Sequence, residues 1–161
     1  MLYVASRSIS QGVRAGIISA LGIFLGCFVH IIAAVLGLSI IISRSAYLFS
    51  IIKYAGAAYL IYLGIKALVT KLNVNPNKNI VRVDQWKLFK QGIVTNALNP
   101  KVAIFFLSFL PQFIDPYSPF FKVQLFTLGI WFASQGTLIL IIVAIVLGKT
   151  KDFFKQNPKV W

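Results

Sequence analysis

The sequence predicts an all-α fold, a polytopic transmembrane helix bundle, and three observations support this. The chain of 161 residues is 58% hydrophobic and only 12% charged, which is unlike a soluble domain of this size. Three windows reach or exceed the roughly 20 apolar residues that a helix needs to cross a bilayer: Ala15–Ile42, Ala46–Val69 and Phe120–Leu147. A fourth, Leu88–Ile114, is as long but contains polar residues. We therefore expect about four full spans.

The positions of the basic residues argue for membrane topology. A formal net charge of +13 could indicate a nucleic-acid partner. The cations instead gather in three groups: Arg7 and Arg14; Lys66, Lys71, Lys78, Arg82, Lys87 and Lys90; Lys149, Lys151, Lys155 and Lys159. The intervening connections are poor in cations, as the positive-inside rule requires. We predict that residues 6–14, 70–87 and 149–161 face the cytoplasm, with no nucleic-acid partner and a lesser contact with anionic lipid.

Two segments outside the spans, the N-terminal stretch and a polar central segment, predict how the chain is divided. "MLYVASRSISQG", residues 1–12, is a short apolar stretch that leads into a basic loop, which is typical of the end of an N-terminal helix. Residues 70–87 are polar and rich in Asn, and Pro76 interrupts them. We expect a cytoplasmic loop there, which divides the chain into parts 1–69 and 88–161.

Glycines in the first two windows predict close helix packing. Gly22, Gly26 and His30 are four residues apart, so they share one helix face. Gly22 and Gly26 form a pair of small residues that lets another backbone approach closely. Gly56 and Gly64 form a comparable stripe in the second window. The pattern leaves open whether these glycines pack within one chain or between copies in a homo-oligomer.

The motif "NALNPKVAIFF", which starts at Asn96, predicts a helix break inside the fourth window. Pro100 has no N–H, and the residue before a proline is pushed away from the α region. Asn99 and Pro100 therefore read as an N-cap and the first residue of a new helix. The span becomes two half-helices. The second presents unpaired N–H groups and a partial positive charge inside the membrane.

Lys101 adds a full positive charge at this break, and a substrate carboxylate would match it. Asn96 and Asn99 could contribute side-chain or carbonyl contacts. A lysine halfway along a span is usually functional because of its cost in lipid. The competing interpretation is a proline kink in which the asparagines bond neighbouring helices and Lys101 extends to the membrane surface. We favour the substrate site, formed by Asn96, Asn99, Pro100 and Lys101.

Two further polar residues lie near the middle of their windows. His30 can titrate between pH 5 and 8 and is the candidate for proton coupling. The competing role, a hydrogen-bonded packing residue, is the commoner one for a lone histidine. Gln135 is a candidate substrate contact, and interhelical hydrogen bonding is the favoured alternative for it.

The remaining chemistry of the sequence excludes several classes. All three acids, Asp84, Asp115 and Asp152, lie in connections or at span ends, which gives little support to a dication pathway. The single cysteine, Cys27, excludes an internal disulfide and a cysteine-built metal site. The chain carries no nucleotide-binding loop, HExxH-like pattern or serine hydrolase motif. We expect no enzyme activity, no cofactor and no metal.

Several stretches closely resemble the LysE/RhtB amino-acid exporter family. They are residues 1–39, "KYAGAAYLIYLGIKAL" and "GIVTNALNPKVAIFFLSFLPQFIDP", and the Asn-Pro-Lys segment with "FLPQF" is fairly specific. The resemblance implies one LysE-type membrane domain over residues 1–161 of a multi-pass protein in the bacterial inner membrane. It also implies descent from a six-helix inverted-repeat transporter driven by a proton or ion gradient. A broken helix in each half would frame a midplane substrate site.

The chain departs from the family pattern at both ends. Family members carry a Pro-Gly-Pro-Asn stretch just before the position of Met1 and a sixth helix after the position of Trp161, so we expect a truncated exporter. The leading hypothesis is efflux of homoserine, threonine-type or related neutral amino acids, because no acid lies within a span. The alternative is a truncated, non-transporting membrane protein, or a subunit that requires a partner.

Overall fold

The computed structural model describes residues 1–69, 82–115 and 117–156. Most of the predicted cytoplasmic loop, residues 70–81, lies outside the described residues, as does the end of the basic tail, residues 157–161. The predicted division into 1–69, 70–87 and 88–161 is a statement about membrane topology and stays a prediction.

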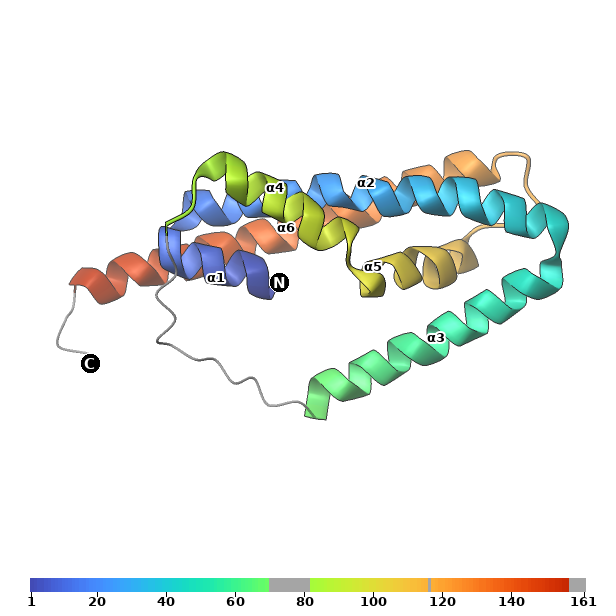
Figure 1. Cartoon of the computed structure of the whole chain (residues 1–161), viewed down its shortest axis with the longest axis horizontal. Helices are drawn as coiled ribbons and strands as arrows, with labels where there is room; N and C mark the ends of the chain where they lie inside the picture. Colours follow the sequence, from blue (N-terminus) through green and yellow to red (C-terminus); the bar gives the residue numbers. More distant parts are fainter. Residues whose placement is uncertain (70–81, 116, 157–161) are drawn as a thin grey trace. The chain divides into compact units, whose positions relative to one another are not determined.

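Helices make up nearly all of the described chain, as Figure 1 shows. The six α-helices are α1 (Leu2–Gln11), α2 (Val13–Arg44), α3 (Ala46–Val69), α4 (Gln85–Ala97), α5 (Pro100–Ile104) and α6 (Phe121–Gln156). A π-helical turn, η1 (Phe105–Phe109), and a 3-10 turn, η2 (Leu110–Phe113), follow α5. The described residues contain no strand, and the predicted all-α class is confirmed.

The helices coincide with the predicted membrane spans. Three are long and apolar enough to cross a bilayer: Val13–Leu38, Tyr47–Lys66 and Phe121–Lys149. The segments Gln85–Ala97 and Pro100–Phe113 pass the same test together as one interrupted span. The prediction of a polytopic helix bundle with an interrupted fourth span is therefore confirmed.

One face of α2 carries an exposed apolar stripe. Five large apolar side chains recur every three or four residues and are 44–58% exposed: Leu21, Leu25, Val29, Ile32 and Leu36. Residues at this spacing share one helix face. A continuous apolar stripe of this kind is unfavourable in water, whereas lipid tails cover it without cost.

Polar caps and a glycine fix the ends of two helices. Asp84 caps α4, since its Oδ2 accepts a hydrogen bond from the Trp86 N–H at 3.1 Å. This cap starts α4 at Gln85, within the segment that the sequence assigned to the loop. Gly12 separates α1 from α2 with φ of +92°, a conformation that side-chain-bearing residues rarely adopt.

The described chain forms two compact units. The first comprises Met1–Cys27, Asn79–Leu98 and Phe132–Trp161, and it includes α1, α4 and parts of α2 and α6. Its core joins three of these helices through buried apolar residues. They are Val4, Ala20, Leu140 and Ala144, with Tyr3, Ile17, Ile23 and Ile141 packed against them.

Glycines bring α2 and α4 together within the first unit. A Cβ added to Gly22 would collide with the carbonyl oxygen of Phe89. A Cβ added to Gly26 would lie 2.7 Å from the carbonyl oxygen of Ile93. Gly92 faces back from α4, where an added Cβ would lie 2.6 Å from the Ser19 carbonyl oxygen. The small residues thus allow backbone-to-backbone contact.

The second unit comprises Phe28–Lys78 and Asn99–Trp131. Here α3 packs on η1, because Gly56 leaves room for the Ser108 side chain, which an added Cβ would strike. On α6, a Cβ added to Gly129 would lie 3.0 Å from Ile31 and 3.3 Å from Phe106. Gly64 differs: an added Cβ would meet no atom within 4 Å among the described residues, so they offer it no packing partner.

Candidate functional site

The interrupted span has the local geometry that the sequence predicts. Asn99 is extended, with φ of −86° and ψ of 107°, and Pro100 is the first residue of α5. The Asn99 Oδ1 accepts a hydrogen bond from the Lys101 N–H at 3.0 Å. The predicted N-cap and proline start are confirmed. A short polar side chain before a proline is well suited to end one helix and begin the next.

The prediction of unpaired N–H groups at this helix start is wrong. The Lys101 N–H bonds the Asn99 side chain, and the Val102 and Ala103 N–H groups both bond the Asn99 carbonyl oxygen at 3.1 Å. Asn99 supplies both a side-chain and a main-chain acceptor, so it satisfies all three donors. An anion at this position would therefore meet the partial positive charge of the helix start and the Lys101 ammonium.

Lys101 and Pro100 are exposed at the first turn of α5, and Asn99 is half-buried. The ammonium stands on a segment that belongs, by composition, to a membrane span. A charge in this position is costly in hydrocarbon unless it reaches water, pairs with another charge or binds an ion. The geometry thus leaves a cation available at the helix break.

Asn96 lies on the other side of the break and performs a packing role. It is 5% exposed. Its Nδ2 donates to the carbonyl oxygen of Ile23 at 2.8 Å and to the Cys27 Sγ at 2.9 Å. These bonds tie α4 to α2 within the first unit, which is the role that the proline-kink interpretation gave to the asparagines. A substrate contact by Asn96 stays a prediction.

His30 is buried in the second unit, at 5% exposure. Its imidazole stacks on the Phe106 ring, with 6.1 Å between centroids and 28° between planes. Phe106 belongs to η1, which continues directly from α5. His30 therefore packs against the helical segment that begins with α5 and carries Lys101. The contact residue, Phe106, lies five residues after Lys101 in the sequence. The role of His30 in proton coupling stays a prediction.

Gln135 lies on α6 in the first unit, with an exposed side chain. The neighbouring Thr137 is buried and donates its hydroxyl to the Ala133 carbonyl oxygen at 2.8 Å within the same helix. A substrate contact by Gln135 also stays a prediction.

Sequence reasoning missed the π-helical turn η1 that follows α5. The Leu110 N–H bonds the carbonyl oxygen of Phe105, five residues earlier. Two side chains bond main-chain carbonyls at the start of this turn and within it: the Ser108 hydroxyl donates to the Ile104 carbonyl at 2.7 Å, and the Gln112 amide donates to the Ser108 carbonyl at 2.8 Å. Pro111, with no N–H, is the sequence signal for this irregularity.

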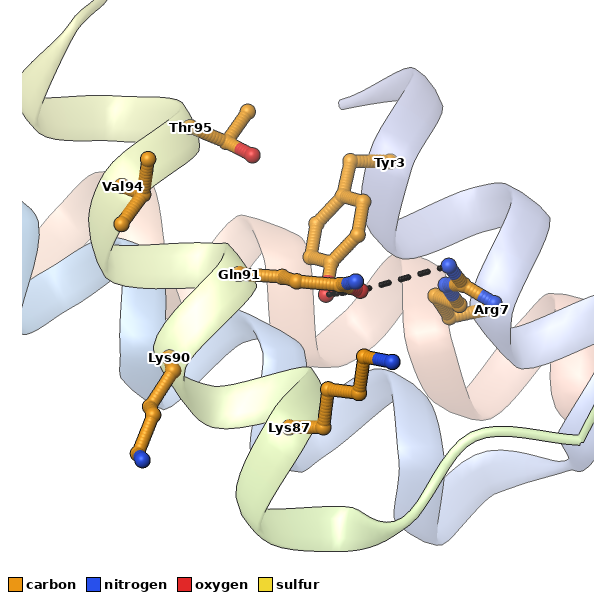
Figure 2. A pocket seen from close by; sticks show the side chains of 7 residues that line it. All are labelled: Tyr3, Arg7, Lys87, Lys90, Gln91, Val94 and Thr95. Carbon is orange, nitrogen blue, oxygen red and sulfur yellow. Dashed lines mark hydrogen bonds between the residues drawn. The ribbon is translucent and has the colours of Figure 1, made fainter.

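Two surface pockets also went unpredicted. One, of about 480 Å³, lies in the first unit between α1 and α4 and appears in Figure 2; Tyr3, Arg7, Lys87, Lys90, Gln91, Val94 and Thr95 line it. The other, of about 550 Å³, lies in the second unit and is lined by Phe113, Ile114, Asp115, Val123, Gln124, Thr127, Leu128 and Trp131. Neither of these two contains a predicted substrate-binding residue.

Comparison with known proteins identifies relatives. The family model described as LysE type translocator matches residues 1–161. A leucine efflux protein from Salmonella typhimurium (strain LT2) is 34% identical over 129 residues, which is 80% of this chain and 61% of that protein. A homoserine/homoserine lactone efflux protein from the same strain is 37% identical over 114 residues, 71% of this chain and 55% of that protein. No solved structure gives a significant match.

The bonds of Asn96 predict a measurable loss of stability. The variant Asn96→Ala would leave the Ile23 carbonyl without its side-chain donor, and we expect it to lower the free energy of unfolding by about 1 kcal/mol. Thr95→Ala, at the adjacent exposed position, is the matched control and should change it by less than about 0.5 kcal/mol. Unfolding in mixed micelles, followed by circular dichroism, measures both. Equal stability of the two variants would contradict the packing role.

Proposed function

The chain belongs to the LysE type translocator family, and we propose that it is an amino-acid efflux transporter. It is a multi-pass protein of the inner membrane. The chain spans 55–61% of the length of the two relatives named above, so its activity as a 161-residue protein is itself part of the proposal.

One observation carries the proposal: the fourth span is interrupted by the Asn99 cap and the Pro100 start, and a lysine follows at once. Transporters of several folds bind substrates where a broken helix places a positive helix end near the middle of the membrane. Amino acids carry a carboxylate in common, whatever their side chain. We assign the Lys101 ammonium to that carboxylate, with Asn99 as the residue that holds Lys101 in the first turn.

The substrate class follows from what the spans contain. No Asp or Glu lies within the four predicted windows, so the chain offers no carboxylate to pair with a cationic substrate side chain. The two relatives are named for leucine and for homoserine and its lactone. A neutral amino acid of this size, such as leucine, homoserine or threonine, is the substrate we propose.

The remaining predicted residues receive secondary roles. His30 would carry the proton that couples export to an ion gradient, because it is a histidine inside a candidate span and stacks on Phe106 of the segment that follows Lys101. Contacts of Asn96 and Gln135 with the substrate are expected from the sequence alone. Export would proceed as the helix groups move about the site in alternating access.

The role of Lys101 predicts the effect of its removal on efflux. In proteoliposomes loaded with radiolabelled leucine or homoserine, Lys101→Ala should slow export about tenfold or more, since a charge-assisted hydrogen bond contributes about 1.5–3 kcal/mol. Lys53→Ala is the control, because Lys53 lies on α3 with its ammonium 5.1 Å from the Tyr54 ring centroid. Export by Lys101→Ala at the wild-type rate would refute the assignment, and no export by the wild-type chain would refute the proposed function.

The role of His30 predicts a separate change. With a pH gradient imposed across the same vesicles, wild-type export should accelerate, and His30→Gln should remove this acceleration because the amide cannot titrate. Substrate exchange in the absence of a gradient serves as the control and should persist, which shows that the buried site has kept its fold. A variant that responds to the gradient as the wild type does would eliminate His30 as the proton carrier.

A further inference from the structure

Three cations gather around one pocket of the first unit, and no acid lines it. We call it the basic pocket and define it by its lining residues, which come from α1 and α4: Tyr3, Arg7, Lys87, Lys90, Gln91, Val94 and Thr95. None of its lining residues is among those proposed to bind the transported substrate, so the proposed transport function does not use it.

Neutral partners hold Arg7 in place at this pocket. Its Nη2 donates to the Gln91 Oε1 at 3.3 Å, and its guanidinium lies 5.7 Å from the centroid of the Tyr3 ring. The Tyr3 hydroxyl donates in turn to the Leu88 carbonyl oxygen at 2.8 Å. These contacts fix the orientation of the guanidinium and leave its charge without an anionic partner among the lining residues. A planar guanidinium held in this way is suited to a phosphate.

The two lysines differ in direction. Figure 2 shows the Lys87 side chain extending toward the Arg7 side of the pocket, whereas Lys90 extends away. The Lys90 ammonium lies 5.1 Å from the centroid of the Trp86 ring. Arg7 and Lys87 are therefore the two cations that a ligand in the pocket would meet together.

The lining residues on α4 change from cationic to apolar along the helix. Lys87, Gln91 and Val94 recur at helical spacing and share one face. Lys87 lies near the capped start of α4, beside Trp86, a residue type that favours the membrane interface. Val94 lies about two turns further into the span and is 54% exposed. A phospholipid has the same order, with a charged phosphate at the interface and an acyl chain below it.

We propose that the basic pocket binds the head-group phosphate of an anionic phospholipid, with Arg7 and Lys87 on the phosphate and an acyl chain along Val94. Free phosphate shares the charge chemistry, but only a lipid would also cover the exposed apolar surface of Val94. Basic pockets between membrane helices are established as sites for anionic head groups in other proteins.

Quenching of Trp86 fluorescence by brominated lipid tests the proposal. The background substitutions Trp131→Phe and Trp161→Phe leave Trp86 as the only tryptophan of the full chain. In phosphatidylcholine vesicles, brominated phosphatidylglycerol should compete for the site about tenfold better than brominated phosphatidylcholine, because two cations favour the anionic head group. Arg7→Gln with Lys87→Gln should remove this preference. Retention of the full preference would overturn the proposal.

A matched control tests whether general surface charge causes the effect, and a single substitution tests the contribution of Lys87. Arg14→Gln with Lys149→Gln removes the same charge from exposed positions of α2 and α6 in the same unit and should keep the preference. An equal loss in this control would make the effect one of general surface charge and overturn the site. Lys87→Gln alone removes an exposed side chain and should lose about half of the preference on a logarithmic scale; no loss would likewise count against the pocket.

Inorganic phosphate separates the two sources of the ligand. When phosphate replaces chloride at equal ionic strength, the preference for phosphatidylglycerol should be unchanged, because free phosphate lacks the acyl chain that holds the lipid phosphate at the site. If the replacement of chloride by phosphate reduced the preference for phosphatidylglycerol, free phosphate would be the ligand and the assignment to a lipid would be overturned.

Discussion

In the hydrocarbon core of a bilayer every main-chain polar group needs a hydrogen-bond partner inside the protein. A proline has no main-chain N–H, so one carbonyl of its helix loses its donor. The fourth span depends on this constraint. Pro100 cannot continue α4, so Asn99 ends one helix and caps the next, and its two oxygens take the N–H groups of Lys101, Val102 and Ala103. The break is thus locally satisfied, and a cation can stand at a fixed place inside a span.

The second proline of the span is accommodated by different means. Before Pro111 the helix widens into the π-helical turn η1, and the side chains of Ser108 and Gln112 bond the main-chain carbonyls of Ile104 and Ser108. Gly56 on α3 leaves room for Ser108, and His30 stacks on Phe106 in the same turn. The irregular segment is therefore packed on both α3 and α2 within the second unit.

The sequence predicts features that depend on local chemistry. Span length follows from apolar runs, and the Asn99 cap follows from the chemistry of Asn and Pro. The contact of Gly22 with α4 follows less directly, since a small residue permits a close approach without specifying which helix approaches. Gly64 has the same spacing signal and meets no described neighbour, which shows the limit of the pattern.

Features that depend on contacts between helices could not be predicted. A membrane helix is apolar on all sides, so its sequence does not state which face meets protein. For this reason the sequence predicted the same role, a substrate contact, for both asparagines of the motif. In the structure Asn96 bonds α2, whereas Asn99 caps α5. The basic pocket also required the placement of α1 beside α4, because Arg7 and Lys87 are far apart in the sequence.

If Lys101 binds the carboxylate of the transported amino acid, the protein must distinguish an amino acid from its amide, and a binding cycle measures this difference. Calorimetry would compare leucine and homoserine with their amides, which lack the negative charge. We expect the wild type to prefer the acid about tenfold or more and Lys101→Ala to bind both equally. If Lys101→Ala keeps the full preference for the acid, Lys101 does not bind the carboxylate, which would then be recognised elsewhere.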